Sequence, residues 1–275
     1  HAGQGPLVRP HRAGRRGIDT HGSCYAMINR IDFDYKNLKK ITDKDVEPIS
    51  SQFKLSVNTV LNLIDQHDDA TIDTILSSNF YSFQMYGKSF LQRKGKSHYR
   101  FNRLKKQLEK LGYIKDRKLT EKGIFSSKIY TDEILMGELF CTDFYKKLNE
   151  YKLILLLTAL CYESRRGNDF YKLFKTKDLT ELKRYLFSFK SFIKEQRFEA
   201  LELLTSLVYP LYNGQTLFEV FKNTNLQEGD VLRLFRQVLD RLNQLKAATP
   251  DERLWMLLDN CQSVLENSMK NLDIL

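Results

Sequence analysis

The chain has 275 residues, of which 42% are hydrophobic, so it is long enough to bury one or two cores. Its 44 Lys and Arg residues exceed its 34 Asp and Glu residues, giving a formal charge of +10. A positive field of this size favours polyanionic partners, because phosphate neutralisation releases counterions. The most apolar stretch, residues 153–162, is about half as long as a helix that spans a bilayer, so we expect no membrane partner.

The positions of the cysteines and histidines argue against a disulfide framework and against a zinc site. Cys24, Cys141, Cys161 and Cys261 lie far apart and form no C-x-x-C pair, and no histidine stands at metal-ligand spacing from them. We therefore expect reduced thiols, a cytoplasmic location and no metal.

The N-terminal segment, residues 1–30, combines an Arg- and Gly-rich run at 12–19 with an apolar run at 24–28. The apolar run has the length of one buried strand, and one strand cannot stand without partners. We interpret residues 1–30 as the end of a larger domain. Residues 31–79 are predicted to be a linker with one helix, which begins near Ser56 or Asn58 and ends at the acidic cluster 65–69.

Residues 80–130 are predicted to form a winged helix. Phe101, Leu104 and Leu108 fall at helical spacing, and Gly112 is a natural residue to end that helix. The segment 113–119 has a polar centre between apolar ends, which predicts a β-hairpin followed by another helix from Thr120. A helix directly followed by such a hairpin is the winged variant of the helix-turn-helix unit.

Residues 131–275 are predicted to form an α-helical bundle. The first long helix should begin at Thr142 or Asp143 and continue to Tyr162. The further helices are expected at 179–194 and 198–208 (ended by Pro210 and Gly214), 216–222, 230–246, and after a capping box at 249–252 with Pro250 at the first helical position.

No catalytic motif is complete. The runs at 87–89 and 95–97 read Gly-Lys-Ser, but a phosphate-binding loop needs another glycine five residues before the Gly-Lys pair. Ser82 and Phe90 stand at those places, and neither run follows a strand. We therefore expect no ATP hydrolysis from this chain alone.

The region around the predicted winged helix is strongly basic. Between residues 88 and 128, acidic residues occur only at 109, 116 and 121, against fourteen Lys or Arg, which include Arg103 and Lys106. We interpret these cations as phosphate contacts. The interleaved aromatics are interpreted as core residues; they are Tyr81, Phe83, Tyr86, Phe90 and Tyr99. In the bundle, Arg233, Arg236 and Arg241 lie opposite the apolar stripe of their helix, so we expect them to face solvent.

Several segments, taken in order, resemble the DExH-box superfamily-2 RNA helicases of the superkiller and exosome-cofactor type. Residues 12–19 and the strand after them resemble helicase motif VI and the last strand of the second RecA-like domain. The later segments resemble the family's post-RecA linker (48–63), winged helix (108–123), bundle entry (132–139) and C-terminal DSHCT domain (214–221 and 228–233).

The resemblance implies a role for several residues. Arg12 and Arg15 fall on the motif VI arginines that reach the γ-phosphate, so ATP and Mg²⁺ would be the cofactors of the intact parent. Glu163 and Arg233 fall where the family's bundle faces the nucleic-acid channel, and Arg236 is close on the same helix. The parent would be an ATP-dependent, 3′-to-5′ RNA helicase, and this chain would guide single-stranded or partly duplex RNA out of it.

The sequence departs from the family at its start. Val8 and His11 occupy the places of the motif VI Gln and Gly, which suggests a chain cut inside motif VI, without its partner RecA-like domains. No arch insertion fits between Phe83 and Leu104. The fold class is therefore mainly α, a winged helix and a DSHCT-like bundle behind a RecA-like α/β remnant. The alternative is a winged-helix DNA-binding regulator with a helical dimerisation or effector domain, and a third reading is a helical scaffold for a protein partner.

Overall fold

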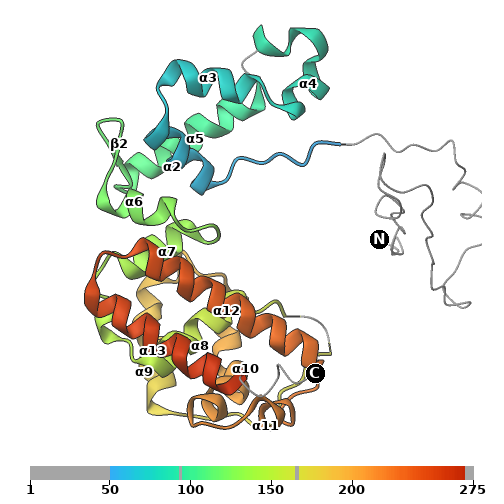
Figure 1. Ribbon diagram of the computed structural model, residues 1–275, viewed down its shortest axis with the longest axis vertical. Helices are drawn as coiled ribbons and strands as arrows, with labels where there is room; N and C mark the ends of the chain where they lie inside the picture. Colours follow the sequence, from blue (N-terminus) through green and yellow to red (C-terminus); the bar gives the residue numbers. More distant parts are fainter. Residues whose placement is uncertain (1–49, 93–94, 165–166, 270–275) are drawn as a thin grey trace, which may run out of the picture. The chain divides into compact units, whose positions relative to one another are not determined.

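The computed structural model describes residues 50–92, 95–164 and 167–269 (Figure 1). Arg12, Arg15 and the strand expected at 24–28 lie outside these residues. The described part is mainly α-helical with one two-stranded sheet, as the sequence predicts. Along the described ranges, no helix combines the length and apolarity that crossing a bilayer requires.

The first described elements form a small helical core. They are α2 (Val57–Gln66), α3 (Asp69–Ser77), α4 (Phe80–Tyr86), the 3-10 helix η2 (Gly87–Gln92) and α5 (Lys96–Lys110). Ser56, Asp68 and Asn79 cap α2, α3 and α4, each accepting a hydrogen bond from the backbone amide three residues later. The expected linker thus holds two helices instead of one, because Asp68 of the acidic cluster starts a new helix. Buried residues of α2, α3 and α5 share one cluster.

A hairpin follows α5, as predicted. Gly112 ends the helix at a φ of 77°, and the Tyr113 amide donates to the Leu108 carbonyl at 2.9 Å. The strands β1 (Ile114–Lys115) and β2 (Lys118–Leu119) pair antiparallel. Asp116 and Arg117 both take left-handed backbone angles, which the tight two-residue turn requires. Helix α6 (Glu121–Ser127) then begins at its cap, Thr120.

The remaining helices form the predicted bundle around α8 (Figure 1). The bundle elements are α7 (Glu133–Phe140), η3 (Tyr145–Lys147), α8 (Glu150–Cys161), α9 (Lys177–Leu186), η4 (Phe187–Phe189), α10 (Glu195–Tyr212), α11 (Leu217–Phe221), α12 (Glu228–Ala248) and α13 (Glu252–Met269). Every residue from 151 to 160 is buried. The single cation among them, Lys152, is paired with Asp178 at 3.1 Å and Glu181 at 2.7 Å. Since a buried charge needs partners, these two carboxylates allow lysine to lie in the centre of the bundle.

Several expected helix ends differ in the structure. The helix expected at 179–194 already ends at Leu186, where the 3-10 helix η4 follows, and α10 begins at Glu195. Helix α8 starts after Asn149, whose side chain caps it, and not at Thr142 or Asp143. Helix α13 is capped by Asp251, which accepts from the Leu254 amide at 2.9 Å, so Thr249 is not its cap. Pro210 lies inside α10 and does not end it.

Pro210 is tolerated inside α10 because Asn223, from another segment, donates a hydrogen bond to the backbone carbonyl that the proline leaves unpaired. A proline has no N–H, so the carbonyl of Ser206 has no partner four residues later. The side-chain amide of Asn223 donates to that carbonyl at 3.1 Å, and the Ser206 hydroxyl donates to the Asn223 carbonyl at 3.0 Å. The helix therefore continues until Tyr212, just before Gly214 with its φ of 81°.

Arg241 does not face solvent as expected. Its side chain is buried, donates to the Thr131 carbonyl at 2.6 Å and approaches the Asp132 carboxylate at 3.3 Å. Asp132 also pairs with Arg197 at 2.9 Å. This cluster fixes the connection between α6 and α7 to α10 and α12 within the larger core.

Candidate nucleic-acid interface

Helix α5 presents a basic stripe, which we define as Lys96, Tyr99, Arg103, Lys106 and Lys110. These residues recur every three or four positions and are exposed, opposite the buried stripe that holds Phe101, Leu104 and Leu108. Within the described ranges, no carboxylate pairs with any of the four cations. The stripe thus leaves its charge available to phosphate groups.

The aromatics of this region are not core residues, contrary to expectation. Tyr99 is 72% exposed and Phe83 49% exposed, while Tyr81, Tyr86 and Phe90 are half-buried. Tyr99 falls outside the buried stripe of α5, and Phe83 meets Phe90 edge-on near the surface at 5.7 Å between ring centres. The exposed ring of Tyr99, between basic residues, can therefore stack on a base.

A second feature is a pocket where α8 ends and α12 begins. Its volume is about 230 Å³, and it is lined by Cys161, Tyr162, Glu163, Asn168, Leu226, Asp230, Arg233, Leu234 and Gln237. Glu163 and Arg233, which are far apart in sequence, thus line the same pocket. Arg236 is exposed on α12 but does not line the pocket, and neither do Arg103 and Lys106 of α5.

The loop beside this pocket is held by asparagine side chains. Asn225 donates to the Gly167 carbonyl at 2.7 Å and accepts from the Asp169 amide at 2.8 Å. Asn168 donates to the Tyr162 hydroxyl at 2.9 Å. Sequence reasoning missed both asparagines, because an asparagine in a loop gives no signal of the segment to which it will bind.

The charges of the pocket suit a ligand with both hydrogen-bond donors and acceptors, such as the edge of a base, better than they suit a phosphate. Arg233 and Asp230 form a surface ion pair at 3.0 Å, and Glu163 adds a second, exposed carboxylate. Two acids against one cation disfavour a bound polyanion, whereas bases and ribose hydroxyls offer both donors and acceptors. Burial raises the pKa of the Cys161 thiol to about 11, so this thiol is neutral at pH 7 and not an activated nucleophile.

No metal site is evident in the part of the chain that the structure describes: no three His, Cys, Asp or Glu side chains there are grouped to hold an ion. The described cysteines, Cys141, Cys161 and Cys261, are all free.

Comparison with known proteins identifies the larger part of the chain. Over 77 residues it is 35% identical to mRNA transport homolog 4 of Caenorhabditis elegans, a match that covers 28% of this chain and 7% of that protein. The chain thus spans only a small share of that relative. The profile of the DSHCT (NUC185) domain matches residues 116–267, from the hairpin turn to α13, which is more than half of the chain. The match confirms the DSHCT part of the predicted resemblance: the chain belongs to the DSHCT (NUC185) domain family, a C-terminal domain of superkiller-type helicases.

Proposed function

We propose that this chain is the RNA-guiding C-terminal region of an ATP-dependent RNA helicase that unwinds 3′ to 5′. The observation that carries the proposal is that Glu163 and Arg233 line one pocket inside the segment that matches the DSHCT domain. The ATPase would reside in partner RecA-like domains. Arg12 and Arg15 would contribute to an ATP and Mg²⁺ site there, and the free cysteines favour a cytoplasmic location.

In this proposal the strand leaving the motor meets two kinds of surface. Residues 80–130 act as a winged helix whose basic stripe tracks phosphates without regard to sequence. The Glu163–Arg233 pocket then contacts the edges of an unstacked base or its ribose, with Arg233 as donor and Glu163 as acceptor. Arg236, exposed on the same helix as Arg233, would contact the strand next to the pocket.

The Arg233 contact can be tested with one substitution. We expect Arg233→Ala to weaken the binding of a short oligouridylate about tenfold, because a hydrogen bond from a charged group contributes about 1.5 kcal/mol. Fluorescence anisotropy with labelled oligouridylate measures the Kd. Arg253→Ala, which removes an exposed arginine from α13, is the matched control and should leave the Kd unchanged. Equal affinity of the two variants would refute the role of Arg233.

The basic stripe makes a prediction about salt. The double variant Arg103→Ala/Lys106→Ala should reduce the slope of log K against log salt concentration by about 1.4 for single-stranded RNA, since each lost phosphate contact removes about 0.7. Binding titrations over a series of NaCl concentrations give this slope. Lys190→Ala/Lys194→Ala removes the same charge from exposed positions between η4 and α10, and should leave the slope nearly unaltered. A slope that responds equally to both double variants contradicts a specific role for the stripe.

One observation favours a second function, that of a winged-helix regulator that binds DNA. The hairpin next to α5 carries the exposed cations Lys115, Arg117 and Lys118, and such a hairpin can lie along a duplex. Tight, sequence-specific binding to duplex DNA would favour this function. Weak, salt-dependent and sequence-indifferent binding to single-stranded RNA favours the helicase region.

A further inference from the structure

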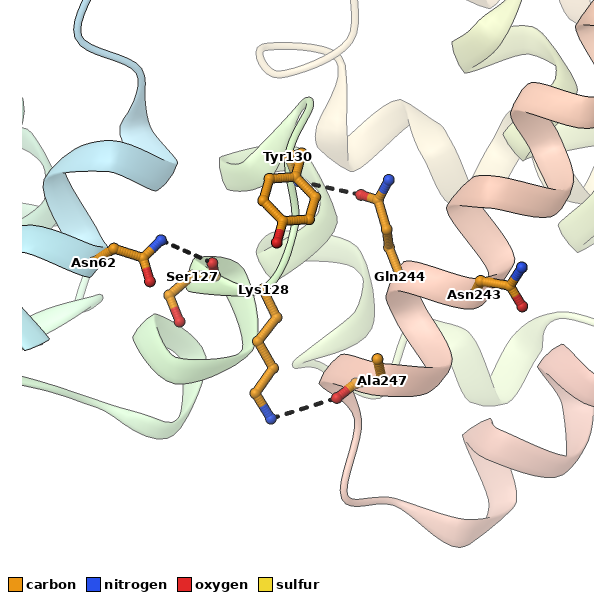
Figure 2. Close-up of a pocket in the computed structure, with 7 residues that line it drawn as sticks. All are labelled: Asn62, Ser127, Lys128, Tyr130, Asn243, Gln244 and Ala247. Carbon is orange, nitrogen blue, oxygen red and sulfur yellow. Dashed lines mark hydrogen bonds between the residues drawn. The ribbon is translucent and has the colours of Figure 1, made fainter.

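A second and larger hollow lies between the α6–α7 connection and α12. Its volume is about 460 Å³, within the range of ligand pockets, and Figure 2 shows the residues that line it. They are Asn62, Ser127, Lys128, Tyr130, Asn243, Gln244 and Ala247. We call it the junction groove, because α2 and α6 border it on one side and α12 on the other.

Tyr130 presents its ring to this groove without being part of a core. The side chain is 70% exposed, and Figure 2 shows the ring between Asn62 and Gln244. Its position is fixed through the backbone, since the Tyr130 amide donates to Gln244 Oε1 at 3.1 Å. Gln244 is fixed in turn by its own donation to Asp240 at 2.7 Å. An exposed ring on a backbone that is held in this way is available to stack on a base.

The groove also has a cation and no carboxylate in its lining. Lys128 Nζ lies 3.4 Å from the Ala247 carbonyl at the end of α12, and this interaction with a helix C-terminus leaves its full charge in place. Asn62 donates to the carbonyls of Asn58 and Ser127 at 3.0 and 3.1 Å, so its own amide oxygen is oriented and can accept from a ligand. Apart from the Tyr130 ring and Ala247, the lining residues are polar, and none offers an anchor for an apolar peptide side chain.

We propose that the junction groove binds one nucleotide of single-stranded RNA, with the base stacked on Tyr130 and its phosphate next to Lys128. The polar side chains, among them Asn62, would meet the edge of the base. A planar aromatic ring, an isolated cation and oriented amides within one groove match the parts of a nucleotide. This inference rests on the proposed function for the identity of the strand, and it adds a contact separate from the Glu163–Arg233 pocket.

The test uses the full chain and a short fluorescein-labelled oligouridylate. Tyr130→Ala should weaken binding between about fivefold and a hundredfold, the effect of losing one stacked base. Tyr130→Phe keeps the ring and should stay within about twofold. Since the hydrogen bond to Gln244 comes from the Tyr130 backbone, Tyr130→Ala keeps it, and unchanged thermal unfolding verifies this. Phe187→Ala removes another exposed ring, from η4, and should leave affinity as it is.

Two further experiments locate the RNA contact and test whether the ligand is an RNA strand or a free nucleotide. Ultraviolet crosslinking to a 4-thiouridine oligonucleotide should label the peptide that holds Tyr130. Uridine monophosphate should compete only at concentrations far above those of the oligonucleotide; competition at equal concentrations would assign the groove to a free nucleotide and overturn the RNA proposal.

The outcomes also separate this inference from the proposed function. If Arg233→Ala weakens binding while Tyr130→Ala does not, and no crosslink reaches Tyr130, the groove proposal is wrong and the helicase proposal stands. If the wild-type chain binds no single-stranded RNA, both are wrong. Loss of affinity in Tyr130→Ala and not in Tyr130→Phe supports the groove.

Discussion

Replacing Gly123 with alanine should lower the free energy of unfolding by about 3 kcal/mol, the upper part of the range for overpacking a core. A Cβ atom built on Gly123 would overlap the backbone oxygen of Tyr113 and lie 3.2 Å from Leu119 Cβ. That oxygen cannot easily move, because it accepts hydrogen bonds from the amide and the hydroxyl of Thr120 at 3.0 and 3.2 Å. The clash is therefore with fixed backbone and not with a flexible side chain.

Urea unfolding followed by circular dichroism measures this change, and the melting temperature should fall by about 6–12 °C for a chain of this size. Gly229→Ala is the matched control. It lies in the first turn of α12, nothing stands within 4 Å of its added Cβ, and alanine has the higher helix propensity, so this variant should be equal to or slightly more stable than wild type. Wild-type stability of Gly123→Ala would show that α6 can move away from the hairpin.

The Gly123 position illustrates which parts of the fold could be predicted from the sequence. The helix end at Gly112, the hairpin and the start of α6 at Thr120 all follow from rules that act within a few residues, and the structure confirms each of them. The amphipathic pattern of α12 likewise predicts its extent to within a few residues. Such elements can be predicted because their hydrogen bonds and backbone angles involve residues that are close in sequence.

Other features depend on partners that are distant in sequence. Pro210 looked like a helix terminator because the amide that satisfies Ser206 comes from Asn223. Arg241 looked like a solvent-facing residue because its partners, Thr131 and Asp132, lie more than a hundred positions earlier. Helical periodicity places a side chain on a face but does not tell which segment will cover that face.

The residues of the candidate sites also differ in whether the sequence alone could predict them. Glu163 and Arg233 could be named only through the family resemblance, since nothing in their spacing indicates that they line one pocket. The basic stripe could be anticipated from charge, but its exposed Tyr99 was expected in a core. Tyr130 gave no signal at all, because its role depends on a groove that forms only when the α6–α7 connection meets α12.

The two regions that we propose to contact RNA are linked through the segment that follows α6. The basic stripe and the Glu163–Arg233 pocket belong to separate cores, and Asn58 of α2 joins these cores by donating to the carbonyls of Ser127 and Ile129 at 2.6 and 2.9 Å. Asp132 supports this joint from the bundle side, because its carboxylate holds the α6–α7 connection to guanidinium groups from α10 and α12.

Replacing Asp132 with alanine should destabilise the protein by about 3 kcal/mol. The variant leaves Arg197 and the buried Arg241 without their shared carboxylate. Removing one partner of a buried ion pair typically costs about 3–5 kcal/mol. We expect the lower end of this range because the Asp132 side chain is 21% exposed. Asp132 also has a left-handed backbone, at a φ of 56°, which alanine tolerates poorly.

The variant Asp132→Asn separates these two causes, because asparagine accepts the left-handed backbone and retains the shape but loses the charge. We expect it to recover about half of the stability that alanine loses, as measured by urea unfolding. Asp143→Ala removes a carboxylate from the exposed pair with Lys146 and should be indistinguishable from wild type, since such surface pairs contribute little. If the Asp132→Ala and Asp132→Asn variants were equally stable, the backbone angle would not matter. If both were as stable as wild type, the arginines would not need this carboxylate, and the Arg241–Thr131 hydrogen bond alone would hold the α6–α7 connection.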